Sequence, residues 1–171
     1  MKVFRGTLIV LLMTLPVLRA QEAPACPCCS GEYRSFDFWV GKWEVTLADG
    51  RPAGTNHIER SQDGCLLQEH WNSARHGSTG TSFTYYNRDL GLWEQLWVDN
   101  GGNVLKLRGG PQGKAMVLSS DPLKEADGTT VVNRITWTPG DDGRVRQLWE
   151  LLRDGTVVQV LFDGYYKKAG E

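Results

Sequence analysis

The sequence predicts an all-β fold, an antiparallel up-and-down barrel of about eight to ten strands with a short N-terminal helical turn. Short runs rich in Val, Ile, Thr and aromatic residues recur every 8 to 12 residues or so, which is typical of sandwiches and barrels. Most of the turns between them contain Asp-Gly or Asn-Gly, where Gly or Asn accepts the positive φ of a tight hairpin. No window of a dozen residues keeps a helical period. Because hairpins link the strands throughout, we expect them to pair in chain order and the sheet to close, which removes its exposed edges.

Each run between two turn signals is an expected strand, and the only expected helix is a short turn around Ser35 to Val40. The strands are expected at residues 42–48, 54–62, 65–73, 79–87, 92–99, 103–109, 113–119, 129–138, 143–153 and 156–166. Among the Asp-Gly turns between them are Asp63-Gly64, Asp127-Gly128 and Asp154-Gly155.

The first residues have the pattern of a secretory leader. Two basic residues lie within Met1 to Arg5, and Gly6 to Leu18 are almost wholly apolar but too few to span a membrane, which needs about 20 residues. We expect a signal peptide over residues 1–20, with Ala23 and Ala25 as later cleavage options, a Cys- and Pro-rich lead-in over 21–35, and a single barrel domain over 36–171. A lipid anchor at Cys26 is a less favoured alternative.

Charge and length narrow the functional class of the mature chain. Without the leader, 16 Lys and Arg stand against 20 Asp and Glu, a formal charge of −4. Nucleic acid is not an expected partner, because phosphate binding needs a clustered basic surface. About 150 residues make one ordinary domain, and no second apolar run follows the leader. We therefore expect an exported protein, periplasmic or secreted, without a transmembrane anchor.

The four cysteines suit an oxidising compartment. Cys26, Cys28 and Cys29 lie in the lead-in, and Cys65 opens an expected strand. We expect a disulfide from the N-terminal cluster to Cys65, with Cys29 the favoured partner because it is nearest to the fold. The other two cysteines either bond together or stay free. The C-x-x-C spacing of Cys26 and Cys29 is weak evidence for redox catalysis, since no βαβ unit follows.

Three expected strands share one alternation, in which every second residue is aromatic, aliphatic or a polar amide or acid. Alternate residues of a strand lie on one face, and a face this rich in tryptophan should point inward. The polar residues of these faces would then be inside, with Asp99 as a further candidate. The predicted ligand-binding residues are Glu69, Trp71, Trp93, Gln95, Trp97, Gln147 and Trp149.

Buried polar groups of this kind have two interpretations, since an unpaired one costs about 1 to 3 kcal/mol. The first is internal pairing, for example of Glu69 with Arg60, Arg134 or Arg146. The second is a cavity in which tryptophan faces hold an amphipathic or aromatic small molecule and a few polar groups orient it. We favour ligand binding, and the alternative is a non-enzymatic structural or interaction domain of the cell envelope with a solid core.

No metal, cofactor or catalytic residue is predicted. His57, His70 and His76 do not fall in a pattern that would bring three or four zinc ligands together. No strand-turn-helix context surrounds a Ser or Cys nucleophile. Glu69 with Asp99 as a hydrolytic carboxylate pair is weak evidence in a chain with 20 acidic residues.

Several motifs together resemble a family of secreted, lipocalin-like bacterial proteins of unknown function. They are F-D-F-W-x-G-x-W-x-V from Phe36, G-C-x-L-x-E-x-W from Gly64, W-x-Q-x-W-x-D from Trp93, R-I-T-W-T-P from Arg134 and D-G-R-V-R-Q from Asp142. The resemblance extends to Tyr166 and so covers nearly the whole mature chain.

The resemblance implies a calycin-like barrel in which a helical turn leads into a G-x-W at the first strand. Trp39, Gly41 and Trp43 would form this structural motif, and Trp43 would close one end of the barrel against Lys167 or Lys168. Haem-binding barrels of related shape use a histidine late in the chain, so haem is disfavoured here, where none follows His76.

Overall fold

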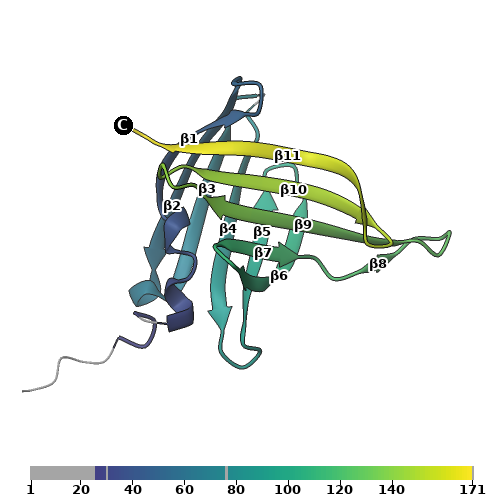
Figure 1. Cartoon of the computed structure of the whole chain (residues 1–171), viewed down its shortest axis with the longest axis horizontal. Helices are drawn as coiled ribbons and strands as arrows, with labels where there is room; N and C mark the ends of the chain where they lie inside the picture. Colours follow the sequence, from purple (N-terminus) through teal and green to yellow (C-terminus); the bar gives the residue numbers. More distant parts are fainter. Residues whose placement is uncertain (1–25, 30, 76, 171) are drawn as a thin grey trace, which may run out of the picture.

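All strand pairs in the computed structural model, which describes residues 26–29, 31–75 and 77–170, are antiparallel, and most of them join strands that follow one another in the chain. The strands are β1 (Gly41–Leu47), β2 (Pro52–Ser61), β3 (Leu66–Ser73), β4 (Thr79–Asn87), β5 (Leu92–Asp99), β6 (Val104–Gln112), β7 (Ala115–Ser119), β8 (Leu123–Lys124), β9 (Thr130–Pro139), β10 (Val145–Arg153) and β11 (Thr156–Lys168). β10 pairs with both β9 and β11, and β11 pairs with β1, so the sheet closes on itself (Figure 1). Three 3₁₀ turns accompany them in the described chain: η1 (Gly31–Arg34), η2 (Asp37–Trp39) and η3 (Gln62–Gly64).

The predicted antiparallel barrel is confirmed, with a short helical turn near its N-terminus. Ten of the described strands form the barrel wall, and β8 lies outside it, paired only with the end of β9 through Leu123 and Lys124. Each of the ten expected strands coincides with a strand of the wall to within a few residues. The sequence did not predict β8, because two residues carry no period.

The hairpin between β10 and β11 illustrates why the turns form where they do. Arg153 pairs with Thr156, which leaves a loop of only Asp154 and Gly155. Their φ angles are 44° and 79°, the left-handed conformation that a two-residue hairpin loop requires. Asp tolerates this conformation better than most residues, and Gly adopts it without steric cost.

Aromatic residues around η2 plug one end of the barrel. Phe36 and Trp39 are fully buried, with their rings stacked at 4.9 Å. Phe36 also packs edge-on against Trp93 and Trp137. The indole N–H of Trp43 donates a hydrogen bond of 2.8 Å to the carbonyl of Trp39, which ties the plug to β1. We call this set the aromatic plug: Phe36, Trp39, Trp43, Trp93 and Trp137.

Gly41 lets the last strand lock onto the aromatic plug. Its φ of +140° favours glycine, and a Cβ at this position would overlap the ammonium of Lys168. Lys168 lies over the Trp43 ring, with Nζ 4.0 Å from the centroid, and donates a hydrogen bond of 2.6 Å to the Val40 carbonyl. Of the two lysines expected at this place, Lys168 therefore occupies it.

The lead-in contains one internal disulfide and is joined to the barrel by a second, and this pairing differs from the favoured prediction. Cys65 bonds to Cys28, with Cα atoms 5.0 Å apart, and Cys29 bonds to Cys26. The pairing of Cys29 with Cys65 was therefore wrong, although the expected link from the N-terminal cluster to Cys65 exists. The reason is a tight turn, in which the Cys29 N–H bonds to the Cys26 carbonyl, that brings these two together and leaves Cys28 buried against the fold.

Residues 1–25, which contain the predicted signal peptide and its cleavage site after Ala20, lie outside the described residues. In the part of the chain that the structure describes, no helix is long and apolar enough to cross a membrane.

Candidate functional site

The inward-facing residues of β3, β5 and β10, the three strands with the shared alternation, form the same three layers along the barrel axis. From the plug outward, β3 presents Leu67, Glu69 and Trp71. β5 presents Trp93, Gln95 and Trp97, and β10 presents Val145, Gln147 and Trp149. The interior therefore consists of an apolar floor, a polar middle layer and a tryptophan rim.

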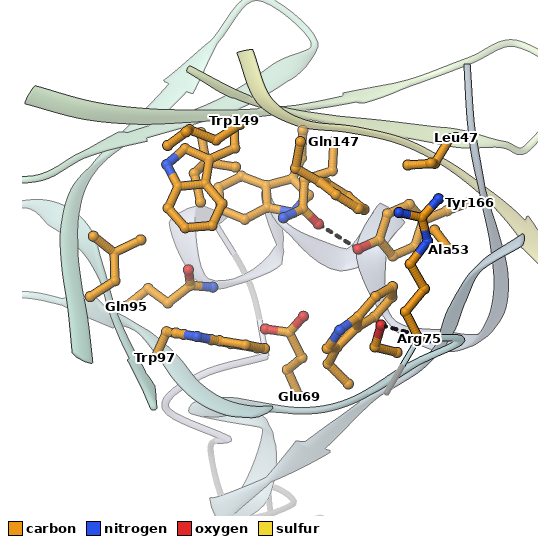
Figure 2. A pocket seen from close by; sticks show the side chains of 16 residues that line it. Leu47, Ala53, Glu69, Arg75, Gln95, Trp97, Gln147, Trp149 and Tyr166 are labelled. Atoms are coloured by element: carbon orange, nitrogen blue, oxygen red, sulfur yellow. Dashed lines mark hydrogen bonds between the residues drawn. The ribbon is translucent and has the colours of Figure 1, made fainter. Parts of the chain in front are cut away.

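A cavity of about 400 Å³ lies between the polar layer and the rim. Figure 2 shows the Glu69 carboxylate pointing into it, with Trp97 beside it and Gln147 and Trp149 on the opposite wall. Arg75 and Leu161, both exposed, contribute to its lining. The full lining is Leu47, Ala53, Glu69, Trp71, Ser73, Arg75, Gln95, Trp97, Leu105, Ile135, Trp137, Gln147, Trp149, Leu161, Phe162 and Tyr166.

Glu69 is the centre of a hydrogen-bond network in the polar layer. Its Oε1 accepts from the amide of Asn56 at 2.7 Å, and its Oε2 accepts from the Ser82 hydroxyl at 2.6 Å. The same Asn56 amide lies 3.3 Å from the Tyr166 hydroxyl, which donates to Oε1 of Gln147. The network thus joins β2, β3, β4, β10 and β11 across the interior.

Burial raises the pKa of both titratable groups of this network, Glu69 and Tyr166. Desolvation raises the pKa of Glu69 to about 6, against the hydrogen bonds from Ser82 and Asn56, which lower it. Desolvation also raises the pKa of Tyr166 well above its usual range, and the nearby Glu69 carboxylate adds to this. Tyr166 is therefore a neutral hydrogen-bonding group, whereas Glu69 titrates near neutrality.

All but one of the predicted ligand-binding residues line the cavity. Glu69, Trp71, Gln95, Trp97, Gln147 and Trp149 surround it, whereas Trp93 lies one layer deeper. Trp93 packs against Phe36, and its indole N–H donates to the Ser35 hydroxyl at 3.0 Å. Its face was correctly expected to point inward, but its depth makes it part of the aromatic plug.

The expected charge partners of Glu69 are bound elsewhere. Arg134 pairs with Glu150, and Arg146 pairs with Asp163, both through outward-facing residues of neighbouring strands. Arg60 pairs with Asp37 of η2 and so holds the plug. Internal pairing of Glu69 with an arginine was therefore a wrong prediction, because short polar side chains from the adjacent strands reach it first.

Asp99 and the described histidines lie apart from the cavity. The Asp99 carboxylate accepts from the Gly101 and Asn103 backbone amides and so caps the turn after β5; its hydrogen bonds with Asn103 lower its pKa. His57 and His70 contact each other across β2 and β3, with ring centroids 6.3 Å apart. Among the described residues, no three His, Cys, Asp or Glu side chains gather where they could hold a metal ion.

Sequence reasoning missed several residues of the site, and only some of these residues carry a signal in the sequence. Tyr166 and Phe162 share the inward face of β11 with Gly164, and this alternation is visible in the sequence. Asn56 and Ser82 lie in strands that have no tryptophan pattern. Only the register of β2 and β4 against β3 brings them to Glu69.

No protein-family model matches this chain, and no curated protein matches its sequence significantly.

Proposed function

We propose that this chain is an exported, lipocalin-like barrel that binds a small amphipathic or aromatic molecule in its tryptophan-lined cavity. The observation that carries the proposal is the cavity itself: about 400 Å³, walled by Trp71, Trp97, Trp137 and Trp149 and lined by a few convergent polar groups. Small-molecule sites are typically about 300 to 1,000 Å³, mostly apolar, with a few polar groups that orient the ligand. An interior of this kind counts against the solid-core alternative.

The proposed export and family rest on other features of the described chain. Two disulfides lie where the lead-in meets the barrel, and disulfides persist in oxidising compartments. Lipocalin-like membership is supported by the closed antiparallel barrel and by the arrangement of Gly41, Trp43 and Lys168 at its plugged end.

A cavity-blocking variant tests the binding proposal. Ala53 is buried on β2 and lines the cavity, so the ring of Ala53→Phe would occupy the space of a ligand. The neutral dye N-phenyl-1-naphthylamine should bind the wild-type protein with a rise in fluorescence. Its affinity should fall at least about tenfold in Ala53→Phe, since a tenfold change corresponds to about 1.4 kcal/mol.

The matched control is Thr55→Phe, which adds the same ring to the exposed face of the same strand and should leave dye affinity unchanged. Native mass spectrometry of protein purified from its own host should also show a bound molecule, and the same spectrum reports cleavage after Ala20. Equal dye binding by wild type and Ala53→Phe, together with no bound molecule, would falsify the proposal.

A further inference from the structure

The charge inside the cavity is unbalanced. Glu69 is 5% exposed, yet no Lys, Arg or His in the described ranges forms an ion pair with it. A carboxylate offers about four lone-pair sites, and Asn56 and Ser82 occupy two of them. The Glu69 carboxylate, which points into the cavity, can therefore accept further hydrogen bonds from a ligand (Figure 2).

Contacts with neighbouring residues hold the aromatic side chains around this carboxylate in place. The Trp97 ring lies against Gly80, where any Cβ would overlap it. The Trp71 ring packs edge-on against Phe162, with centroids 6.0 Å apart. The indole N–H of Trp149 donates to Asn133 at 2.9 Å, so this donor is already used. Trp71, Trp97 and Trp149 all line the cavity, and the π system of an indole ring attracts cations.

Resting on the proposed binding function, we propose that the ligand is an organic cation: an aromatic or aliphatic body that carries a protonated amine. The ammonium donates to the Glu69 carboxylate in the polar layer, and the body lies among Trp71, Trp97 and Trp149. Charge-assisted hydrogen bonds are roughly twice as strong as neutral ones, and cation–π contacts add to them in a desolvated site.

The distribution of charge along the cavity supports this orientation. Among the lining residues, the only other charged group is Arg75, which is exposed to solvent and follows the end of β3. An anionic ligand would have to approach the buried Glu69 carboxylate without a cation to neutralise it, and burying an unpaired charge is costly. A cation instead satisfies the buried acid.

Three probes of matched shape test the charge preference: protonated 2-phenylethylamine, neutral 2-phenylethanol and anionic phenylacetate. Each is titrated against N-phenyl-1-naphthylamine in the cavity, and calorimetry gives its affinity directly, at about pH 7.5, where most Glu69 is ionised. The amine should bind at least about tenfold more tightly than the alcohol, and the anion most weakly. In Glu69→Gln, the amine and the alcohol should bind equally.

Glu59→Gln is the matched control, since it removes the same charge from an exposed position on β2 and should keep the amine preference. Equal or tighter binding of the alcohol or the anion by wild type overturns the cation inference, and so does failure of the amine to displace the dye. In these cases dye binding that is lost in Ala53→Phe keeps the proposed function intact. If the wild-type protein does not bind the dye at all, the result counts against the proposed function.

Discussion

Glu69 is buried as deeply as many apolar residues of the core, yet it carries an ionisable carboxylate between tryptophan rings. Hydrogen bonds from Asn56 and Ser82 offset only part of its desolvation, since its pKa remains raised to about 6. At neutral pH the ionised acid therefore destabilises the empty barrel. A buried acid that costs stability in the free protein and faces a cavity is what the proposed ligand site requires.

Because of this cost, the difference in free energy of unfolding between wild type and Glu69→Gln should depend on pH. The pKa of Glu69 in the folded protein, about 6, exceeds the ordinary glutamate value of 4.5, so the folded protein holds this proton more tightly than the unfolded chain. The contribution of Glu69 to stability is fully present below about pH 4.5 and is lost as the pH rises through about 6. The free energy of unfolding of wild type, relative to Glu69→Gln, should fall by about 2 kcal/mol across this window.

Urea unfolding of both proteins between about pH 4 and 7.5 measures the difference. The other titratable groups that line the cavity are Arg75 and Tyr166, and burial raises the pKa of Tyr166 far above this window. The facing side chains of β2, β4, β5 and β10 are the neutral Asn56, Ser82, Gln95 and Gln147. A difference that does not vary with pH would mean that Glu69 is not desolvated in solution.

At the scale of the element, the described part of the lead-in, with η1, and the adjoining η2 lie at the plugged end of the barrel. Cys28 fixes the lead-in to the residue that precedes β3. Asp37 of η2 pairs with Arg34 at 2.5 Å and with Arg60 of β2. These attachments hold the aromatic plug in place, so the polar layer has a rigid floor and the cavity has one closed end.

The two disulfides should contribute unequally to stability. The Cys28–Cys65 bond spans 37 residues, for which loop-closure entropy gives about 3 to 4 kcal/mol, whereas Cys26–Cys29 spans only three. The double variant Cys28→Ala/Cys65→Ala should lower the free energy of unfolding of oxidised protein by about this amount. Cys26→Ala/Cys29→Ala, the matched control, should lower it by roughly half as much or less.

Urea unfolding with and without reductant checks this expectation, because the reduced proteins should differ little. Non-reducing peptide mapping identifies the bonds themselves. A fragment that links Cys29 to Cys65 in wild-type protein would contradict the pairing.

At the scale of the whole molecule, the sequence predicted the barrel because its signals are local. Period-two alternation identified the inward faces of β3, β5 and β10, and turns such as Asp154-Gly155 marked the hairpins that join them. Sequential hairpins then leave one economical arrangement, a sheet that closes on itself.

Depth along the axis and cross-strand partners could not be predicted in the same way. Alternation assigns Trp93 and Trp97 to one face, but only the register of neighbouring strands places Trp93 beside Phe36 and Trp97 beside the cavity. The partners of Glu69 and of Cys65 depend equally on non-local geometry. A sequence period fixes which face a side chain takes, whereas the site depends on the layer in which it lies.

The barrel interior is packed in the core and hollow at the cavity, so the same Leu→Ala substitution should destabilise the protein by different amounts in the two parts. Leu118 of β7 is fully buried in the core, whereas Leu105 of β6 lines the cavity and has empty space on one side. Leu118→Ala should lower the free energy of unfolding by about 2 to 5 kcal/mol, because it removes packed methyl groups and leaves a void. Leu105→Ala should cost about 1 kcal/mol, since its side chain is only partly removed from water. Urea unfolding measures both, and dye affinity should change only in Leu105→Ala. Equal costs would mean that the cavity is filled by the protein's own side chains in solution, which would remove the physical basis for ligand binding.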